Sequence, residues 1–223
     1  MKDIYFLGID DANRSEIIGS QWIAGVLVNK SGLSKLNTLP YLNDSKVVSK
    51  ARRFDLYEWA KINTKHIAIN IEPEEISSGE NLNDLEAYYV ALVIDWAINL
   101  CHEYSDDFKL KVYIDNWEYN ETNFWKRMTV ISDKISGIFI NPFKDEYIVE
   151  HHADQKYKIV QLASVIAKCN SDLEKEKLRN EFGDFGSGNV NDPKTKQFIL
   201  SNPDCIWIKK SYKTYKELIE KSL

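Results

Sequence analysis

The stretch from Ile4 to Ser15, which reads IYFLGIDDANRS, constrains the fold of this chain more than any other. Its short, nearly continuous apolar run is typical of a buried strand. Two adjacent carboxylates, Asp10 and Asp11, follow this run directly. Neighbouring like charges beside a core are unfavourable unless a divalent cation neutralises them. On this stretch alone, a polar turn that happens to hold two aspartates is the alternative interpretation.

Composition sets the class of protein. The chain has 223 residues, of which 43% are hydrophobic and 28% are charged, as is usual for a soluble globular protein. No apolar run approaches the roughly 20 residues of a membrane helix, and the N-terminus does not resemble a signal peptide. We therefore expect a cytoplasmic protein without membrane contact. Three widely spaced cysteines fit neither a disulfide framework nor a zinc cluster.

The net charge of −5 argues against a protein that coats nucleic acid along its length. It is compatible with an enzyme that acts on nucleic acid, because an acidic metal site lowers the net charge while a local basic patch binds phosphate. Lysine and arginine cluster at 46–53 and again at 194–216. A solvated face is the alternative interpretation of each cluster.

Hydrophobic patterning predicts one α/β domain. Strands are expected at Ile4–Ile9, at Ile17–Val28 (antiparallel to the first), and at His66–Ile71, Phe108–Asp115 and Ile135–Ile140, with an extended segment at Tyr147–Asp154 and a turn at Asn29–Gly32. Helices are expected at Ser49–Ile62, Asn81–His102, Asn120–Ile131, Val160–Phe182, Asp192–Leu200 and Ser211–Leu223. We assign the apolar and aromatic stripe of the second helix, which includes Tyr88, to the core.

Three of the expected extended segments end in acids, namely Asp10–Asp11, Asp115 and Asp154. Parallel neighbouring strands bring such ends together at one edge of a sheet, where α/β proteins place their sites. Four carboxylates without an organised histidine or cysteine set favour a hard cation such as Mg²⁺ or Mn²⁺. Two such ions roughly 4 Å apart can support phosphodiester cleavage. Spacing suggests this arrangement without establishing it.

Motifs over nearly the whole chain, in the same order, resemble ribonuclease HII, the type-2 ribonuclease H family, and most closely its archaeal-style members. The motifs are Gly8–Ser15 for the family's GIDEAGRG, Asp44-Ser45-Lys46 with Arg52-Arg53 for DSK and a basic helix, Leu82–Glu86 for LNExE, Tyr113-Ile114-Asp115 for YxD, His151–Asp154 for HKAD, Leu162–Lys168 for the helix AASIxAK, Gly186–Thr195 for GSGYPSDPxT, and Lys209–Thr214 for RxSWKT. Each motif alone is weak, but their collinearity makes chance a poor explanation.

The resemblance implies an RNase H-like fold, with a mixed central sheet flanked by helices over residues 1–183 and a helical C-terminal extension over 184–223. It also implies metal-dependent cleavage of RNA in an RNA–DNA hybrid or a ribonucleotide-containing DNA duplex, giving 5′-phosphate and 3′-hydroxyl ends, by a protein expected to be a monomer. The family's catalytic and metal-binding acids map to Asp10, Asp11, Asp115 and Asp154. Its substrate contacts map to Asn13, Arg14, Ser15, Lys46, Ser187 and Asn189. An exposed lysine is the alternative for Lys46, and Asp172 is assigned a structural role, as a solvated helix acid or a salt-bridge partner.

Three departures from the family pattern lie at this site. The family's second acid is glutamate, and Asp11 is shorter by one methylene, or roughly 1.5 Å. The family's GRG loop, which approaches the ribose 2′-hydroxyl, is here Asn13-Arg14-Ser15; Asn tolerates a left-handed backbone better than most residues. The family's junction tyrosine is Asn189, which cannot stack on a nucleotide. We therefore expect a weakened preference for a single embedded ribonucleotide.

Two other functions stay open at this point. One is a catalytically weak or inactive relative that binds RNA–DNA hybrid or RNA, which the changes at Asp11, Asn13, Ser15 and Asn189 motivate. The other is a metal nuclease with a different nucleic-acid substrate. The presence of all four carboxylates favours the endoribonuclease.

Overall fold

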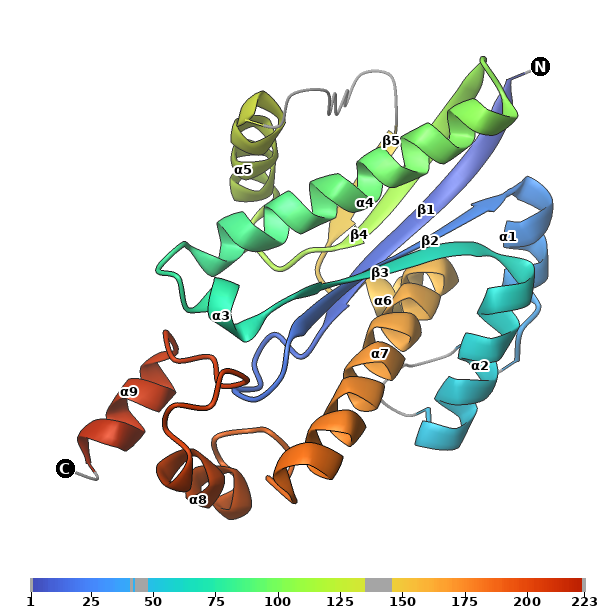
Figure 1. The fold of residues 1–223 in the computed structure, drawn as a ribbon. Helices are drawn as coiled ribbons and strands as arrows, with labels where there is room; N and C mark the ends of the chain where they lie inside the picture. The colour runs from blue at the N-terminus through green and yellow to red at the C-terminus, as the bar shows by residue number, and fades with distance from the viewer. Residues whose placement is uncertain (1, 41, 43–47, 135–145, 222–223) are drawn as a thin grey trace.

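The protein is built on one five-stranded sheet. The computed structural model describes residues 2–40, 42, 48–134 and 146–221. The strands lie in the order β3-β2-β1-β4-β5 (Figure 1). Pairing is antiparallel between β1 and β2 and between β2 and β3, and parallel between β1 and β4 and between β4 and β5. The strands are β1 (Asp3–Ala12), β2 (Gln21–Asn29), β3 (Lys65–Ile71), β4 (Phe108–Asp115) and β5 (Glu146–Glu150).

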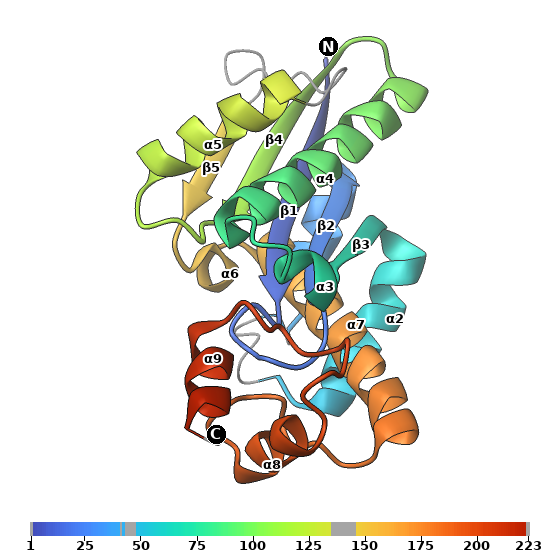
Figure 2. The same ribbon diagram turned by 60° about the vertical axis from the view of Figure 1, so that its left-hand side comes forward.

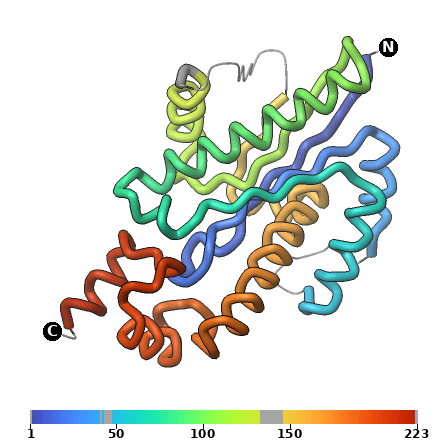
Figure 3. Tube along the Cα trace, in the orientation of Figure 1, coloured from blue at the N-terminus to red at the C-terminus, as the bar shows by residue number. Residues whose placement is uncertain are grey.

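Helices cover both faces of the sheet, as the ribbon and the tube show (Figures 1 and 3). On one face, α4 (Leu82–Tyr104) packs on β1 and β2 and against α5 (Glu121–Lys134). On the other face, α7 (Lys158–Phe182) packs on the same two strands and is flanked by α1 (Lys30–Asn37) and α2 (Lys50–Asn63). Two separate hydrophobic cores result, one on each side of the sheet. This mixed sheet between helical layers is the RNase H-like fold that the motifs implied.

Two glycines let the helices approach the sheet closely. A Cβ atom on Gly8 of β1 would lie 2.5 Å from the backbone carbonyl carbon of Ile159 in α7. A Cβ atom on Gly25 of β2 would lie 2.3 Å from a methyl carbon of Val93 in α4. Both distances are far shorter than van der Waals contact, so the two helix–sheet contacts depend on the absence of a side chain.

The C-terminal part of the chain packs at the end of the sheet where β1 finishes (Figure 2). Its helices are α8 (Pro193–Ser201) and α9 (Lys213–Glu220). A third, smaller core joins Phe185, Ile199 and Ile208 of this part to Ile17, Ile18 and Leu178 of the preceding chain. The helical C-terminal extension is thus present, and the division at residue 183 stays a prediction.

Several local predictions hold to within one or two residues. The Ser49 hydroxyl accepts a hydrogen bond from the Arg52 backbone at the start of α2, and Asp192 caps α8 in the same way through Lys194. Phe108–Asp115 forms a strand with the predicted bounds. Alternating buried and half-buried residues explain why this strand could be read from sequence.

Other local predictions were wrong. Asn29–Gly32 is the start of α1 and not a turn, because the Asn29 side chain caps the helix by accepting from the Gly32 backbone. Strand β2 begins at Gln21, four residues after Ile17. Tyr88 is 38% exposed, because α4 buries small residues such as Ala87 and Ala91 against the sheet. The strand predicted at 135–140 lies outside the described residues.

Two short helices complete the described fold, α3 (Pro73–Ile76) and α6 (Ala153–Lys156). None of the helices in the described ranges is both long enough and apolar enough to cross a membrane.

Candidate active site

The four predicted acids share one cavity of about 400 Å³ at the end of the sheet where β1 and β4 finish. Asp10 and Asp154 are buried, and Asp11 and Asp115 are half-buried. The residues that line the cavity are Asp10, Asp11, Ala12, Asn13, Arg53, Asp115, Asp154, Ser164, Val165 and Lys168. The acids come from β1, β4 and α6, and helix α7 closes the opposite side with Ser164 and Lys168.

Strand register brings the first three acids together. Ile9 of β1 pairs with Ile114 of the parallel strand β4, so the residues that follow, Asp10 and Asp115, lie side by side on neighbouring strands. Asp115 in turn pairs with Glu150, the last residue of β5. The prediction that parallel strands gather these acids at one sheet edge is confirmed for β1 and β4.

Asp154 reaches the cavity differently from the prediction. The extended segment ends at Glu150, and the chain then turns through His152, whose φ of 59° is left-handed. Asp154 lies in the first turn of α6, and the Ala153 backbone donates to Asp115 Oδ1 at 3.0 Å. A four-residue helix is too short for hydrophobic periodicity to reveal, which is why the sequence suggested a continuous extended segment.

The carboxylates of the cavity destabilise one another's charges. Burial, and then the charges of Asp11 and Asp115, raise the pKa of Asp10 well above its ordinary value, against hydrogen bonds from Ser164 and the Asp11 backbone. Burial raises the pKa of Asp11 to about 6, although the Arg14 guanidinium opposes this. Burial likewise raises the pKa of Asp115. A cation bound among these groups would remove the repulsion.

The cavity offers ligands that suit a hard divalent cation, because its described lining residues include four aspartate carboxylates and no histidine or cysteine. As the side chains stand, however, no three His, Cys, Asp or Glu residues of the described chain are arranged so that they could hold a metal ion. The cavity residues nevertheless have the ligand chemistry that such a cation prefers.

The loop after β1 has an unusual backbone. Asn13 is buried and has a φ of 68°, the left-handed conformation in which asparagine is tolerated. Its side-chain amide donates to the carbonyls of Ile18 at 3.1 Å and Ser20 at 2.7 Å, so Asn13 closes its own loop. Ser20 is held in addition by Glu174 of α7, which accepts from its backbone at 2.8 Å and from its hydroxyl at 2.6 Å. The loop is thus fixed in shape without the family's glycines.

The predicted substrate contacts lie at different distances from the acids. Asn13 lines the cavity, whereas Arg14, Ser15, Ser187 and Asn189 are not among its lining residues. The Arg14 guanidinium forms an ion pair with buried Glu86 and donates to Asn83 Oδ1 at 2.5 Å, and Ser15 is exposed. Lys46 lies outside the described residues. The roles of all these residues stay predictions.

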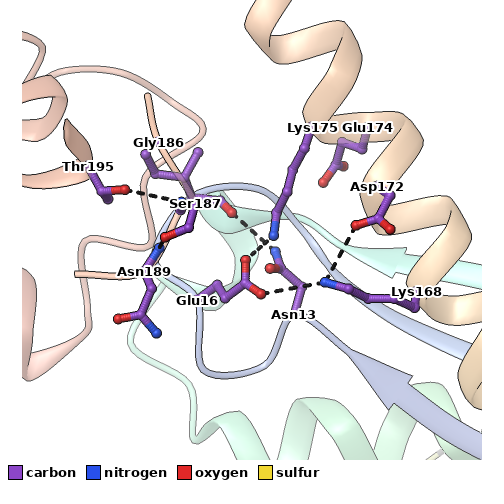
Figure 4. Close-up of polar contacts among 12 residues, drawn as sticks. Asn13, Glu16, Lys168, Asp172, Glu174, Lys175, Gly186, Ser187, Asn189 and Thr195 are labelled. Carbon is purple, nitrogen blue, oxygen red and sulfur yellow. Dashed lines mark hydrogen bonds and ion pairs between the residues drawn. The ribbon is translucent and has the colours of Figure 1, made fainter. Parts of the chain in front are cut away.

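The glycine-rich loop is held by its own polar groups. Asp192 Oδ2 accepts from the Ser187 backbone at 2.7 Å, and Asn189 Oδ1 accepts from the Asn191 backbone at 2.9 Å. The Gly188 carbonyl accepts from the backbones of Ile17 at 2.8 Å and Ile18 at 3.3 Å. The glycine-rich loop is therefore hydrogen-bonded to the segment that follows Asn13, and the two lie side by side (Figure 4).

The C-terminal segment also reaches the loop after β1, a role that sequence reasoning did not find. Fully buried Lys209 donates from Nζ to the Asn13 carbonyl, and the Tyr212 hydroxyl donates to the Arg14 carbonyl at 2.5 Å. Burial, and then the Lys175 ammonium, lower the pKa of Lys209 to about 7. Two successive carbonyls of the predicted ribose-recognition loop are thus bound from nearly 200 residues away in the sequence.

Two polar cavity residues, Ser164 and Lys168, received no role of their own from sequence reasoning, and Arg53 was named only as part of the basic cluster at 46–53. Ser164 and Lys168 are four residues apart on α7, which places them on the same helix face. That spacing inside a recognised motif is the signal that could have found them. Asp172 pairs with Arg53 at 2.8 Å and with Lys168 at 3.5 Å, so of the two structural interpretations of Asp172 the salt-bridge partner is the one observed.

Comparison with known proteins identifies the family. The family model described as Ribonuclease HII matches residues 7–215. The chain belongs to the ribonuclease HII family. It is 35% identical over 193 residues to ribonuclease HII from Methanococcus vannielii, covering 86% of this chain and 74% of that protein. It is 34% identical over 222 residues to ribonuclease HII from Picrophilus torridus, covering 96% of each chain.

Solved structures agree with this assignment. Ribonuclease H2 from Pyrococcus horikoshii superposes with a TM-score of 0.78 at 25% identity, covering 97% of this chain and 98% of that one. Ribonuclease HII from Archaeoglobus fulgidus, solved as a complex with PCNA, superposes with a TM-score of 0.72 at 27% identity, covering 93% of this chain and 95% of that one. The chain is accordingly a metal-dependent endoribonuclease that acts on RNA–DNA hybrids.

Proposed function

We propose that this protein hydrolyses the RNA strand of RNA–DNA hybrids at the cavity formed by Asp10, Asp11, Asp115 and Asp154, leaving 5′-phosphate and 3′-hydroxyl ends. The observation that carries the proposal is the convergence of all four carboxylates on one cavity from β1, β4 and α6. We further propose that the protein works as a monomer.

The four carboxylates would hold two Mg²⁺ or Mn²⁺ ions, which supply a water activated for attack and charge neutralisation at the leaving oxygen. The chain's own groups orient the acids for this purpose. Ser164 and the Asp11 backbone hydrogen-bond to Asp10, and Gln21 donates to Asp11 at 3.2 Å. These bonds favour the ionised carboxylates, which are the forms that bind a cation.

Substrate preference is the second part of the proposal. Asn189 stands where the family has a tyrosine that stacks at the junction between RNA and DNA, and Asn189 offers only hydrogen bonds. Base or sugar stacking on an aromatic ring is worth roughly 1–3 kcal/mol in nucleic-acid complexes. We therefore expect efficient cleavage of long hybrids and inefficient cleavage at a single ribonucleotide.

Cleavage of two labelled duplexes in Mg²⁺ and in Mn²⁺ tests the proposal. One duplex is a full RNA–DNA hybrid, and the other is DNA with a single ribonucleotide. Cleavage of the hybrid alone is the expected result. Equal cleavage of both would contradict the loss of junction preference.

Cleavage of neither duplex by a folded protein would overturn the endonuclease proposal and favour a hybrid-binding relative. The shorter Asp11 and the departures from the family motifs at Asn13, Ser15 and Asn189 are the observations that favour this second candidate. Hybrid binding without cleavage would then be its signature.

A further inference from the structure

Glu16 lies between two lysines beside the acid cavity. Its Oε2 atom forms an ion pair with Lys175, and its Oε1 atom lies 3.6 Å from Lys168 Nζ. Lys168 lines the cavity that holds the four acids. Figure 4 shows the Glu16 carboxylate pointing into the gap between these two ammonium groups. A carboxylate is therefore held where a cavity-lining lysine would otherwise be open to an anion.

Charged side chains from α7, α2 and the loop after β1 form a chain of ion pairs that alternates in sign. Lys175 pairs with Glu16, Glu16 with Lys168, Lys168 with Asp172 at 3.5 Å, and Asp172 with Arg53 at 2.8 Å. Lys168 and Arg53 are the two basic residues of the cavity lining, so both are matched with carboxylates. This arrangement weakens the attraction of the cavity wall for phosphate.

Lys175 strengthens the case for an anion at this position. Its side chain is only 4% exposed, whereas that of Glu16 is 22% exposed. A buried ammonium requires a partner of opposite charge, because its transfer from water is otherwise very unfavourable. Glu16, the more exposed of the two partners, meets this requirement.

The position of Glu16 also links the cavity to the glycine-rich loop. A Cβ atom on Gly188 would lie 3.4 Å from Glu16 Oε2, so the loop that carries Ser187 and Asn189 lies next to the Glu16 carboxylate. Ile17, the next residue, donates to the Gly188 carbonyl at 2.8 Å. Glu16 is therefore in contact both with this loop and, through Lys168, with the cavity that holds the four acids.

We infer that Glu16 occupies a subsite for a backbone phosphate of the nucleic-acid substrate, formed by Lys168 and Lys175. In the free protein the carboxylate stands in for that phosphate, and the substrate must compete with it. The inference rests on the proposed function in one respect, namely that the bound phosphate belongs to a nucleic-acid substrate. It makes Glu16 a residue that lowers affinity for the substrate.

Charge-matched variants test this inference through binding. Fluorescence anisotropy with a labelled RNA–DNA hybrid in Mg²⁺ reports affinity, with Asp10→Asn present in every variant so that the duplex stays intact. Glu16→Gln is expected to bind roughly twofold to fivefold more tightly. The slope of log K against log salt is expected to become more negative by roughly 0.7 to 0.9, because one more phosphate contact forms.

Two controls separate this effect from other causes. Glu176→Gln also removes one negative charge, from an exposed residue of α7 whose Oε2 lies 3.8 Å from Lys50 Nζ. This variant is expected to leave both the affinity for the hybrid and the salt slope unchanged. Glu16→Asp keeps the charge and is expected to keep the original salt slope. An equal gain in Glu176→Gln would mean that net charge alone is responsible and would overturn the inference, as would unchanged or weaker binding by Glu16→Gln.

Thermal unfolding gives a readout that needs no nucleic acid. Glu16→Gln leaves Lys175 without its carboxylate and is expected to melt at a lower temperature than the original protein. Inorganic phosphate should raise its melting temperature more than that of the original protein, compared with sodium chloride at equal ionic strength. Equal shifts in both proteins would contradict an anion subsite. Failure of the unaltered protein to bind or cut the hybrid would count against the proposed function alone, since the phosphate measurement stands independently.

Discussion

The acids of the cavity and the loops beside it, here called the first wall or acid wall and the second wall, are built on different principles. The acid wall uses side-chain charges at the ends of regular elements, and Asp10, Asp115 and Asp154 match the family motifs. The second wall consists of the loop after β1, whose Asn13 lines the cavity, and the glycine-rich loop bonded to it, which lies outside the cavity lining; it departs from those motifs at Asn13 and Asn189. Its backbone is nevertheless held at many points, since Asn13 closes its own loop and Lys209 binds the Asn13 carbonyl.

This difference shows that a metal-binding carboxylate restricts the choice of residue more than a loop conformation does. A carboxylate ligand can be replaced only by another carboxylate at nearly the same place. A backbone conformation can be held by different side chains, provided that they satisfy the same polar groups. The first wall should therefore respond steeply to single changes, and the second in proportion to the bonds that are lost.

The largest expected effect is at the acid wall. Asp10→Asn keeps the size of the side chain and removes its charge, so cleavage of the hybrid should fall by more than roughly 100-fold, since even groups that only orient metal ligands cost 10-fold to 100-fold. Hybrid affinity, measured by anisotropy, should stay within about threefold. Undiminished cleavage by this variant would show that the acids are not the catalytic wall.

A gain of function at the second wall sharpens the comparison. Asn189→Tyr restores an aromatic ring at the junction position and should raise cleavage at a single ribonucleotide relative to the full hybrid. The ratio of the two kcat/KM values is expected to rise by roughly 5-fold to 150-fold, the equivalent of 1–3 kcal/mol of stacking. A ratio that does not move would show that the ring alone does not determine junction preference.

The smallest expected effect comes from the support of the loop. Tyr212→Phe removes the hydroxyl that donates to the Arg14 carbonyl, and kcat/KM should fall by roughly 2-fold to 12-fold, the worth of one hydrogen bond. Tyr215→Phe is the matched control, because its hydroxyl donates to the Pro203 carbonyl at 3.1 Å, away from the cavity.

Melting temperatures of the two phenylalanine variants should fall by similar amounts. Only Tyr212→Phe should alter kcat/KM. Equal kinetic effects in both variants would mean that the C-terminal segment stabilises the protein without positioning the loop.

The same contrast explains what could be predicted from the sequence. The acids were found because each follows a segment whose apolar pattern is local, as in the alternating burial of β4. Helix α6 was missed because four residues carry no period, and α1 was missed because its Asn29 cap has the composition of a turn. The contact of Lys209 with Asn13 and that of Glu16 with Lys175 join residues more than 150 positions apart. Neither hydrophobic periodicity nor secondary-structure propensity in a single sequence reveals contacts between residues so far apart.

Gly8 determines how wide the cavity can be. It lies on β1 two residues before Asp10, so both residues face the same side of the sheet. The backbone of Ile159 and Val160 in α7 rests directly on it, with Ser164 one helical turn further along. Any side chain at position 8 would act as a wedge that drives α7 away from β1 and opens the gap between Asp10 and Ser164. Substitutions elsewhere in the lining can change the chemistry of the cavity, whereas its width depends on the contact between Gly8 and the backbone of Ile159 and Val160.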